Sequence, residues 1–265
     1  MHMRALWNLA VVAVLLGACA SPTLNPSTST SAGSSPSTIS PAARSVLAAV
    51  GDGLVVRRLA SGGFAGAVMS DLVVYGDGRV DLAGFDGVPF EGQIAIGRAA
   101  LLALVAELDD LGAYDTTFEP INDHASRVAD GIGVSIELGV GAESRIIDAY
   151  ALGEAPDAYP EALRQIDGVL LSLMALIETA GPTSGPPSTP GTIAAIRGNL
   201  HIAGGAVRLC DGLAESVPPQ CAADNVLVLG LEADIVDLSV GQGVRWSDGR
   251  VVLVGVWTGS ALDLS

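Results

Sequence analysis

The sequence predicts two folded parts of different class, an α+β domain over residues 44–180 and a small all-β, OB-like barrel over residues 192–265. Three observations support this division. The first part mixes alternating and helical apolar spacing, whereas the second contains only short apolar runs between turn residues. A segment rich in proline and glycine, residues 181–191, separates them and is predicted to be a linker between domains.

Two hairpins are predicted in the first part. Asp71 to Tyr75 and Arg79 to Leu82 read as strands, and the glycines between them permit the tight reversal. Apolar residues alternate strictly from Ile132 to Leu138, and the chain returns from Ser144 to Tyr150 after a glycine-rich turn. Each segment is therefore expected to contribute two antiparallel strands.

A helix is predicted after each hairpin. Leucine and valine recur at helical spacing from Ala99 to Leu111, and Gly112 marks the end of that segment. Glu161 to Thr179 follows Pro160, which suits the start of a helix. Two hairpins, each followed by a helix, predict an antiparallel sheet with helices on one face.

The second part contains five predicted strands. Glycine, serine and threonine lie at the reversals, with Gly204 and Gly205 between the first two strands. Five short strands in this length fit a small closed barrel. The strands are Ile193 to Leu200, Ala206 to Cys210, Asn225 to Leu231, Val251 to Trp257 and Ala261 to Leu264.

The first 18 residues have the layout of a bacterial export signal. Arg4 precedes an apolar run from Leu9 to Leu16, and small residues follow. A transmembrane helix needs about 20 apolar residues, so this run is too short to span a bilayer. Export is the favoured interpretation.

The end of that segment, Leu16-Gly17-Ala18-Cys19, resembles the lipobox of bacterial lipoproteins. The resemblance implies that the thiol of Cys19 receives a diacylglycerol with palmitate-type acyl chains and that Cys19 becomes the mature N-terminus. It also implies anchoring to the outer face of the cell membrane. An ordinary signal peptide with a chance cysteine is the alternative. Residues 19–43 are predicted to be a Ser/Thr/Pro-rich tether, because this composition cannot bury a core.

The remaining cysteines, Cys210 and Cys221, are predicted to form a structural disulfide, since an exported protein occupies an oxidising compartment. A zinc site would need two further ligands, and the mature chain has only His124 and His201. The ten intervening residues also differ from the Cys-x-x-Cys spacing of redox pairs. We therefore interpret this segment as a covalent staple and expect no metal.

Charge excludes one class of partner. The chain has a net charge of −16 and no lysine, and loss of Arg4 with the signal leaves 12 arginines against 29 acidic residues, a net charge of −17. Such a surface repels phosphate backbones and anionic headgroups, so no nucleic-acid binding is expected. Membrane contact should come from the lipid. The lysine-free, Ala/Gly/Val-rich composition also suggests an actinobacterial source.

A second resemblance covers about seventy residues of the C-terminal part. Its segments are similar to those of uncharacterised actinobacterial exported proteins, and this group implies no activity. The segments are Leu209-Cys210, Leu213-Ala214-Glu215-Ser216, Pro218-Pro219-Gln220-Cys221 and Trp246-Ser247-Asp248-Gly249.

Catalytic and metal motifs are not found in the sequence. It contains no Gly-x-Ser-x-Gly elbow, no His-Glu-x-x-His pair and no Walker glycine loop. His124 follows Asp123 in a polar segment, which favours a solvated histidine over half of a catalytic triad. Asp115, Glu119 and Asp123 recur every four residues without the order of a calcium loop. No catalytic residue and no cofactor is predicted.

Three residues are candidates for ligand binding. Glu215 lies between the paired cysteines, where its carboxylate would cap backbone amides or face a ligand. Trp246 and Trp257 would fill the barrel core, cover an open end of the barrel or stack against a polymer. The structural roles are favoured.

Three classes of function follow. The leading hypothesis is a lipid-anchored, non-catalytic envelope protein that binds a partner protein, a polysaccharide or a small ligand. The alternatives are an extracytoplasmic hydrolase with an unrecognised site and an inhibitor-like module that blocks another exported protein. A cleft that gathers His124 with two carboxylates would favour the hydrolase, whereas an exposed apolar or aromatic patch would favour binding.

Overall fold

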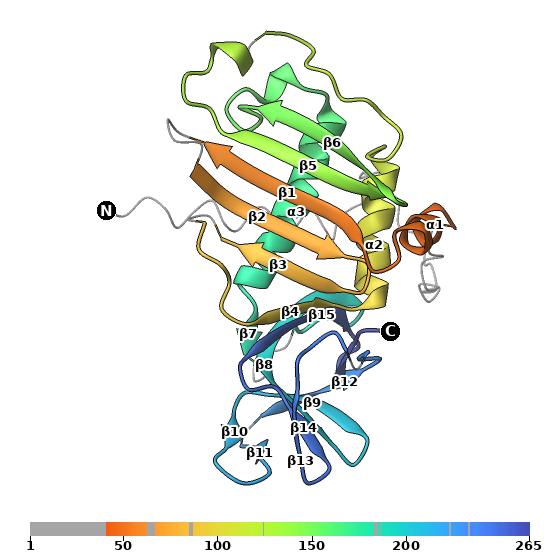
Figure 1. Cartoon of the computed structure of the whole chain (residues 1–265), viewed down its shortest axis with the longest axis vertical. Helices are drawn as coiled ribbons and strands as arrows, with labels where there is room; N and C mark the ends of the chain where they lie inside the picture. Colours follow the sequence, from red (N-terminus) through yellow and green to blue (C-terminus); the bar gives the residue numbers. More distant parts are fainter. Residues whose placement is uncertain are drawn as a thin grey trace, which may run out of the picture.

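The computed structural model describes residues 41–62, 67–84, 87–123, 125–182, 185, 187–222, 224–232 and 234–265, and Figure 1 shows the arrangement. These described residues are mostly β-sheet with three α-helices, and most of the strands belong to one large mixed sheet. The predicted export signal and lipidation site lie outside the described residues. Helix α1, Pro41–Val50, includes the last three residues of the predicted tether and buries Ala43. Proline suits the first position of a helix, which explains this earlier start.

The N-terminal region is a six-stranded antiparallel sheet with the order β4-β3-β2-β1-β5-β6. Both predicted hairpins are present, as β2–β3 and β5–β6. The central strand β1 and the short strand β4 were not predicted. The strands are β1 Leu54–Gly62, β2 Ala67–Tyr75, β3 Arg79–Ala83, β4 Gln93–Ile96, β5 Gly133–Val140 and β6 Glu143–Tyr150.

Helices α2, Arg98–Asp110, and α3, Glu161–Glu178, cover one face of this sheet (Figure 1). Both follow their hairpins as the sequence predicts, and their apolar sides form one core with the inward residues of the strands. Two short 3-10 helices, η2 Ala125–Arg127 and η3 Pro156–Ala158, lie in the connections. The sheet with helices on one face agrees with the predicted α+β class.

A buried polar group lies between the sheet and α3. Nε of Arg58 on β1 donates a hydrogen bond to the Asp167 carboxylate on α3 over 2.6 Å, and another guanidinium nitrogen donates to Ser70 on β2 over 3.1 Å. Arg58 is 5% exposed and the Asp167 side chain 13%. This ion pair joins α3 to the sheet, and both of its side chains are largely shielded from solvent.

The C-terminal region contains all five predicted strands, and their pairings form a closed circuit. β8 pairs with β9, β9 with β12, β12 with β16, β16 with β15, and β15 again with β8. Among the five pairings of this circuit, only the β12–β16 pairing is parallel. Gly204 and Gly205 both have positive φ at the β8–β9 turn, as expected for a two-residue hairpin loop. The strands are β8 Thr192–Ala203, β9 Ala206–Cys210, β12 Asn225–Leu229, β15 Val251–Trp257 and β16 Ala261–Asp263.

Shorter strands lie outside this circuit. β7, Gly181–Pro182, runs beside β8 inside the predicted linker. β13, Ser239–Gly241, and β14, Val244–Trp246, form a hairpin that pairs with β8. β10, Leu213–Ala214, and β11, Gln220–Cys221, form a separate two-stranded sheet.

The two regions meet along a strand pair. β4 and β15 run parallel, with Gln93 opposite Val251 and Ile96 opposite Val254. Val254 packs in the N-terminal core, whereas Ala95 of β4 packs in the C-terminal core. The sheet is therefore continuous across the predicted linker (Figure 1). Among the described helices, none combines the length and apolar character needed to cross a bilayer.

Candidate functional site

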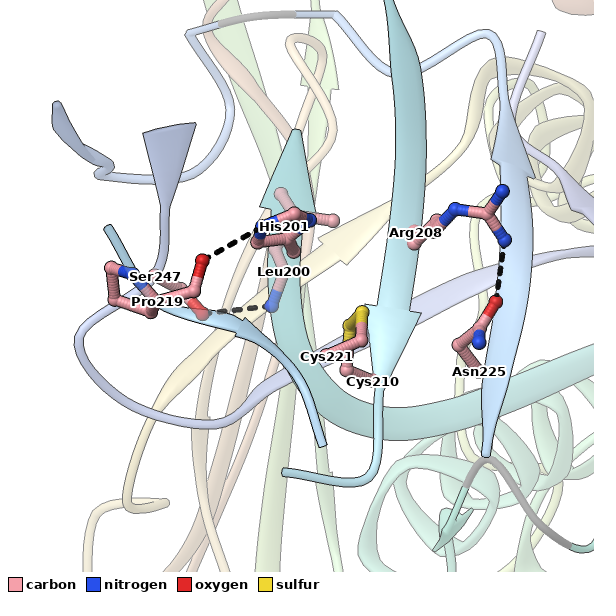
Figure 2. The surroundings of a disulfide bond; sticks show 8 residues. All are labelled: Leu200, His201, Arg208, Cys210, Pro219, Cys221, Asn225 and Ser247. Carbon is pink, nitrogen blue, oxygen red and sulfur yellow. Dashed lines mark hydrogen bonds between the residues drawn. A yellow bond between two sulfur atoms is a disulfide. The ribbon is translucent and has the colours of Figure 1, made fainter. Parts of the chain in front are cut away.

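The segment that follows Cys210 and ends with Cys221, residues 211–221, is called the stapled loop. It leaves the end of β9 at Cys210, forms β10 and β11, and returns to Cys221. The predicted cysteine pair is present at disulfide distance, with Cα atoms 5.5 Å apart (Figure 2). The loop lies at the end of the C-terminal region that is distant from the N-terminal sheet (Figure 1).

The stapled loop covers part of the outer face of the strands. Successive side chains of a strand point to opposite faces, so Leu200 and Leu209 point into the core while His201 and Cys210 point outward. His201 is nevertheless only 8% exposed and Cys210 is fully buried. Outward residues lose contact with water only when another segment covers them. The stapled loop is that segment.

A hydrogen bond fixes the loop at a second point. Nε2 of His201 lies 3.1 Å from the carbonyl oxygen of Pro219 (Figure 2). Because a carbonyl oxygen can only accept, Nε2 must carry the proton and donate it. The disulfide to β9 and this bond to β8 hold the loop on two neighbouring strands. The sequence did not predict that His201 would fix the stapled loop.

The tip of the loop is exposed. Val217 is 88% exposed, the highest value among the exposed large apolar residues of the described chain. The hydroxyl of Ser216 donates to the carbonyl oxygen of Pro218 over 2.9 Å and fixes the local backbone. Glu215 is exposed, and its carboxylate caps no backbone amide of a described residue. The two roles considered for Glu215 from the sequence, capping backbone amides and facing a ligand, stay predictions.

Trp246 lies on the β13–β14 hairpin, directly opposite His201 of β8. Its indole nitrogen donates to Oδ1 of Asp248 over 3.1 Å, and Oδ2 of the same carboxylate accepts from the Ser239 hydroxyl over 2.7 Å. A Cβ atom on Gly241 would lie 3.2 Å from the ring, so the ring packs against this glycine. The ring remains partly exposed and fixed in orientation.

Trp257 is buried. It is 4% exposed and packs with Leu262 and Val226 in the C-terminal core. Of the three roles considered from the sequence, core filling fits this position. Trp246 and Glu215 lie at the surface, whereas Trp257 lies inside the circuit of strands.

Ser247 is a further residue that sequence reasoning missed. It is fully buried, and its hydroxyl accepts from the Leu200 backbone N–H over 2.9 Å (Figure 2). The same hydroxyl donates to the Gly249 carbonyl over 2.7 Å. The bond with Leu200 attaches the end of the hairpin to β8, and the bond to Gly249 fixes the local backbone. A serine beside an exposed tryptophan gives no signal of burial in the sequence.

The outer face of β9 and β12 beside the stapled loop is exposed to solvent. Arg208 on β9 donates to the side-chain oxygen of Asn225 on β12 over 2.7 Å (Figure 2). Both side chains are exposed, and Leu227, paired with Arg208, is also exposed. The guanidinium is thus already engaged by an uncharged partner.

Two hollows lie beside the helices of the described chain. One, of about 50 Å³, is an apolar groove between α2 and α3 that also includes Ile193 of β8 and Val254 of β15, with Glu107 at its wall. Burial raises the pKa of Glu107, and the charge of Asp110 raises it further. Glu107 thus borders the apolar face of α2, where its carboxyl is partly removed from water.

The other hollow, of about 350 Å³, lies between α1, the end of α2 and the β5–β6 turn. Asp109, Tyr114 and Asp115 contribute to its wall. Burial raises the pKa of Tyr114, with a smaller contribution from the charge of Asp109. The Tyr114 hydroxyl is itself buried. It therefore does not face the opening.

The remaining sequence candidates do not assemble into a site. His124 lies outside the described residues. Within the described ranges, no three His, Cys, Asp or Glu side chains are grouped so that they could hold a metal ion, which includes Asp115, Glu119 and Asp123. No protein-family model, curated protein or solved structure matches the chain. A function therefore has to come from its own geometry.

Proposed function

We propose that this protein is an exported lipoprotein, anchored through Cys19, that binds another component of the cell envelope and catalyses no reaction. Its binding surface is the outer end of the C-terminal region, formed by the stapled loop and the adjoining face of the β13–β14 hairpin. The N-terminal region and the tether connect this surface to the lipid.

The fixed conformation of the stapled loop carries this proposal. A disulfide to β9, a hydrogen bond from His201 and a local bond within the tip hold the loop, yet Val217 at its tip packs against nothing that shields it. Ordering a surface before binding reduces the entropy lost on association. Rigid loops that present an exposed side chain are therefore suited to recognition.

We also propose that the circuit of five C-terminal strands is an OB-like barrel. The order β8-β9-β12-β16-β15, with one parallel pair, supports this assignment. OB barrels bind polymers on the face of their second and third strands, which correspond to β9 and β12. The stapled loop narrows this face, and the net charge of −16 argues against oligonucleotides.

Binding is tested with the chain from residue 20 onward, incubated with envelope fragments of its source cell and sedimented. We expect the chain to sediment with the envelope and Val217→Asp to reduce the bound fraction several-fold. Val88→Asp is the matched control, because Val88 is 57% exposed on the N-terminal region. Absence of sedimentation for the wild type would contradict the proposal.

Anchoring is tested by intact-mass analysis and membrane fractionation. The wild type should carry a diacylglycerol on Cys19, and Cys19→Ala should be released or remain unprocessed. A free thiol at Cys19 in the mature protein would rule out the anchor.

The hydrolase remains the second candidate because of Glu107. Many catalytic general acids are carboxyl groups whose pKa is raised by an apolar pocket. The groove of about 50 Å³ is, however, smaller than the 300 Å³ of typical ligand pockets. Screening the wild type and Glu107→Gln against ester, glycoside, peptide and phosphate substrates should give no turnover. Activity lost in Glu107→Gln would favour the hydrolase.

A further inference from the structure

We infer that Trp246 is a stacking platform for a neutral saccharide, so that the envelope component bound by this protein is a neutral polysaccharide. The inference rests on the proposed function and specifies its ligand. Three features carry it: the fixed indole ring, the hydrogen-bonding groups on the segment that holds it, and the net negative charge of the chain together with Asp248.

The first feature is the ring itself. Pyranose rings present a face of polarised C–H groups, which is attracted to the negative face of an aromatic ring. Trp246 lies across Gly241, where the missing side chain leaves room for the indole, and Asp248 holds its nitrogen. The ring therefore cannot turn to fill the core, as Trp257 does, and keeps part of its surface in solvent.

The second feature is the set of hydrogen-bonding groups on the segment that holds the ring. Each carboxylate oxygen of Asp248 accepts one hydrogen bond within the protein, Oδ1 from Trp246 and Oδ2 from Ser239. Each oxygen can accept another hydrogen bond. Gln242, at the turn of the same hairpin, exposes its side-chain amide. Carboxylate and amide oxygens accept from hydroxyl groups, which are what a saccharide presents.

The third feature is charge. The chain carries a net charge of −16, and Asp248 adds a negative charge at the ring edge. Arg208 on the same outer face already donates to Asn225. Phosphorylated or uronic-acid polymers would meet repulsion here, whereas an uncharged glycan would not. The charge thus selects neutral over anionic saccharides.

The test is a titration of the chain from residue 20 onward, followed by tryptophan fluorescence. The probes are laminarin, mannan, arabinogalactan and N-acetylchitohexaose, with polygalacturonate as the anionic comparison. Only Trp246 and Trp257 remain in this chain, and Trp257 is buried. We expect at least one neutral probe to shift the emission and polygalacturonate to leave it unchanged.

Variants assign the effect. Trp246→Ala should weaken binding of the neutral probe 5- to 150-fold, in line with the loss of one stacking contact, and Trp246→Phe should retain part of the affinity. Val240→Ala, on the opposite face of the hairpin, should bind as the wild type does. Near-UV circular dichroism of each variant checks folding, and Trp246→Phe keeps the test valid if the alanine variant unfolds.

Two outcomes would overturn the inference. One is that none of the four neutral probes binds while the chain still sediments with envelope fragments, which leaves the proposed function intact. The other is that protease treatment of the fragments abolishes sedimentation, which identifies a protein partner. Failure of the wild type to sediment at all would instead remove the proposed function.

Discussion

The two regions of the molecule are stabilised differently. Among the described residues, 38 buried apolar residues form the core that the N-terminal sheet shares with its helices, whereas 13 form the core of the C-terminal circuit. The N-terminal sheet has two helices with which to bury its apolar face, whereas the C-terminal circuit encloses a small core. Small cores need an additional constraint. The disulfide supplies it in one region, and the buried Arg58–Asp167 pair lies in the other.

The largest expected effect concerns that pair. Asp167→Ala should lower the free energy of unfolding by about 3–5 kcal/mol, because Arg58 would remain charged, buried and without its carboxylate. Chemical denaturation measures this change. The matched control is Asp71→Ala, since Arg57 and Asp71 form a two-bond pair on the open face of the same sheet, with 40% of the Arg57 side chain exposed. It should cost less than about 1 kcal/mol. Equal costs would show that the position of the pair has no bearing on its importance.

The next effect concerns the staple. Replacing Cys210 and Cys221 with serine should lower the free energy of unfolding by about 3 kcal/mol, since the unfolded chain regains the freedom of the closed loop. Thermal denaturation measures the change, and reduced wild type provides a second comparison. An unchanged midpoint would mean that the small C-terminal core is sufficient without the bond.

The smallest effect concerns Glu107. Its pKa is raised in the folded state, so folding favours the protonated form, and stability falls as pH rises from the unfolded value of about 4.5 through the folded pKa. Glu107→Gln removes this dependence. It should stabilise the protein at pH 7 by less than about 1 kcal/mol, because the carboxyl retains contact with water. The difference between the melting curves should disappear below about pH 4.5, and a difference independent of pH would contradict this origin.

Regular apolar spacing made much of the fold predictable. Both hairpins, α2, α3 and the five strands of the C-terminal circuit follow from periodicity and from the residues at the turns. β1 was not predicted because Arg57 and Arg58 interrupt its apolar pattern. The charge of Arg58 is compatible with the core only because Asp167 lies opposite, 109 positions away in the sequence. β4 was not predicted because four residues are too few to establish a period.

The candidate site was predictable only in part. The pairing of Cys210 with Cys221 follows from counting cysteines in an exported chain. The covering of His201 by the stapled loop does not, because an outward position on a strand normally means exposure. Trp246 and Trp257 look alike in sequence, and strand register alone places one outside the circuit and the other inside. Such register depends on pairings between distant segments.

The parallel pairing of β4 with β15 has a consequence for synthesis. β4 ends at residue 96 and β15 begins at residue 251, so a ribosome makes the whole intervening chain before the partner of β4 exists. During that time one side of the apolar segment Gln93–Ile96 has no strand to pair with and could recruit a neighbouring nascent chain. A chaperone that binds extended apolar segments would be most useful to this protein in that interval.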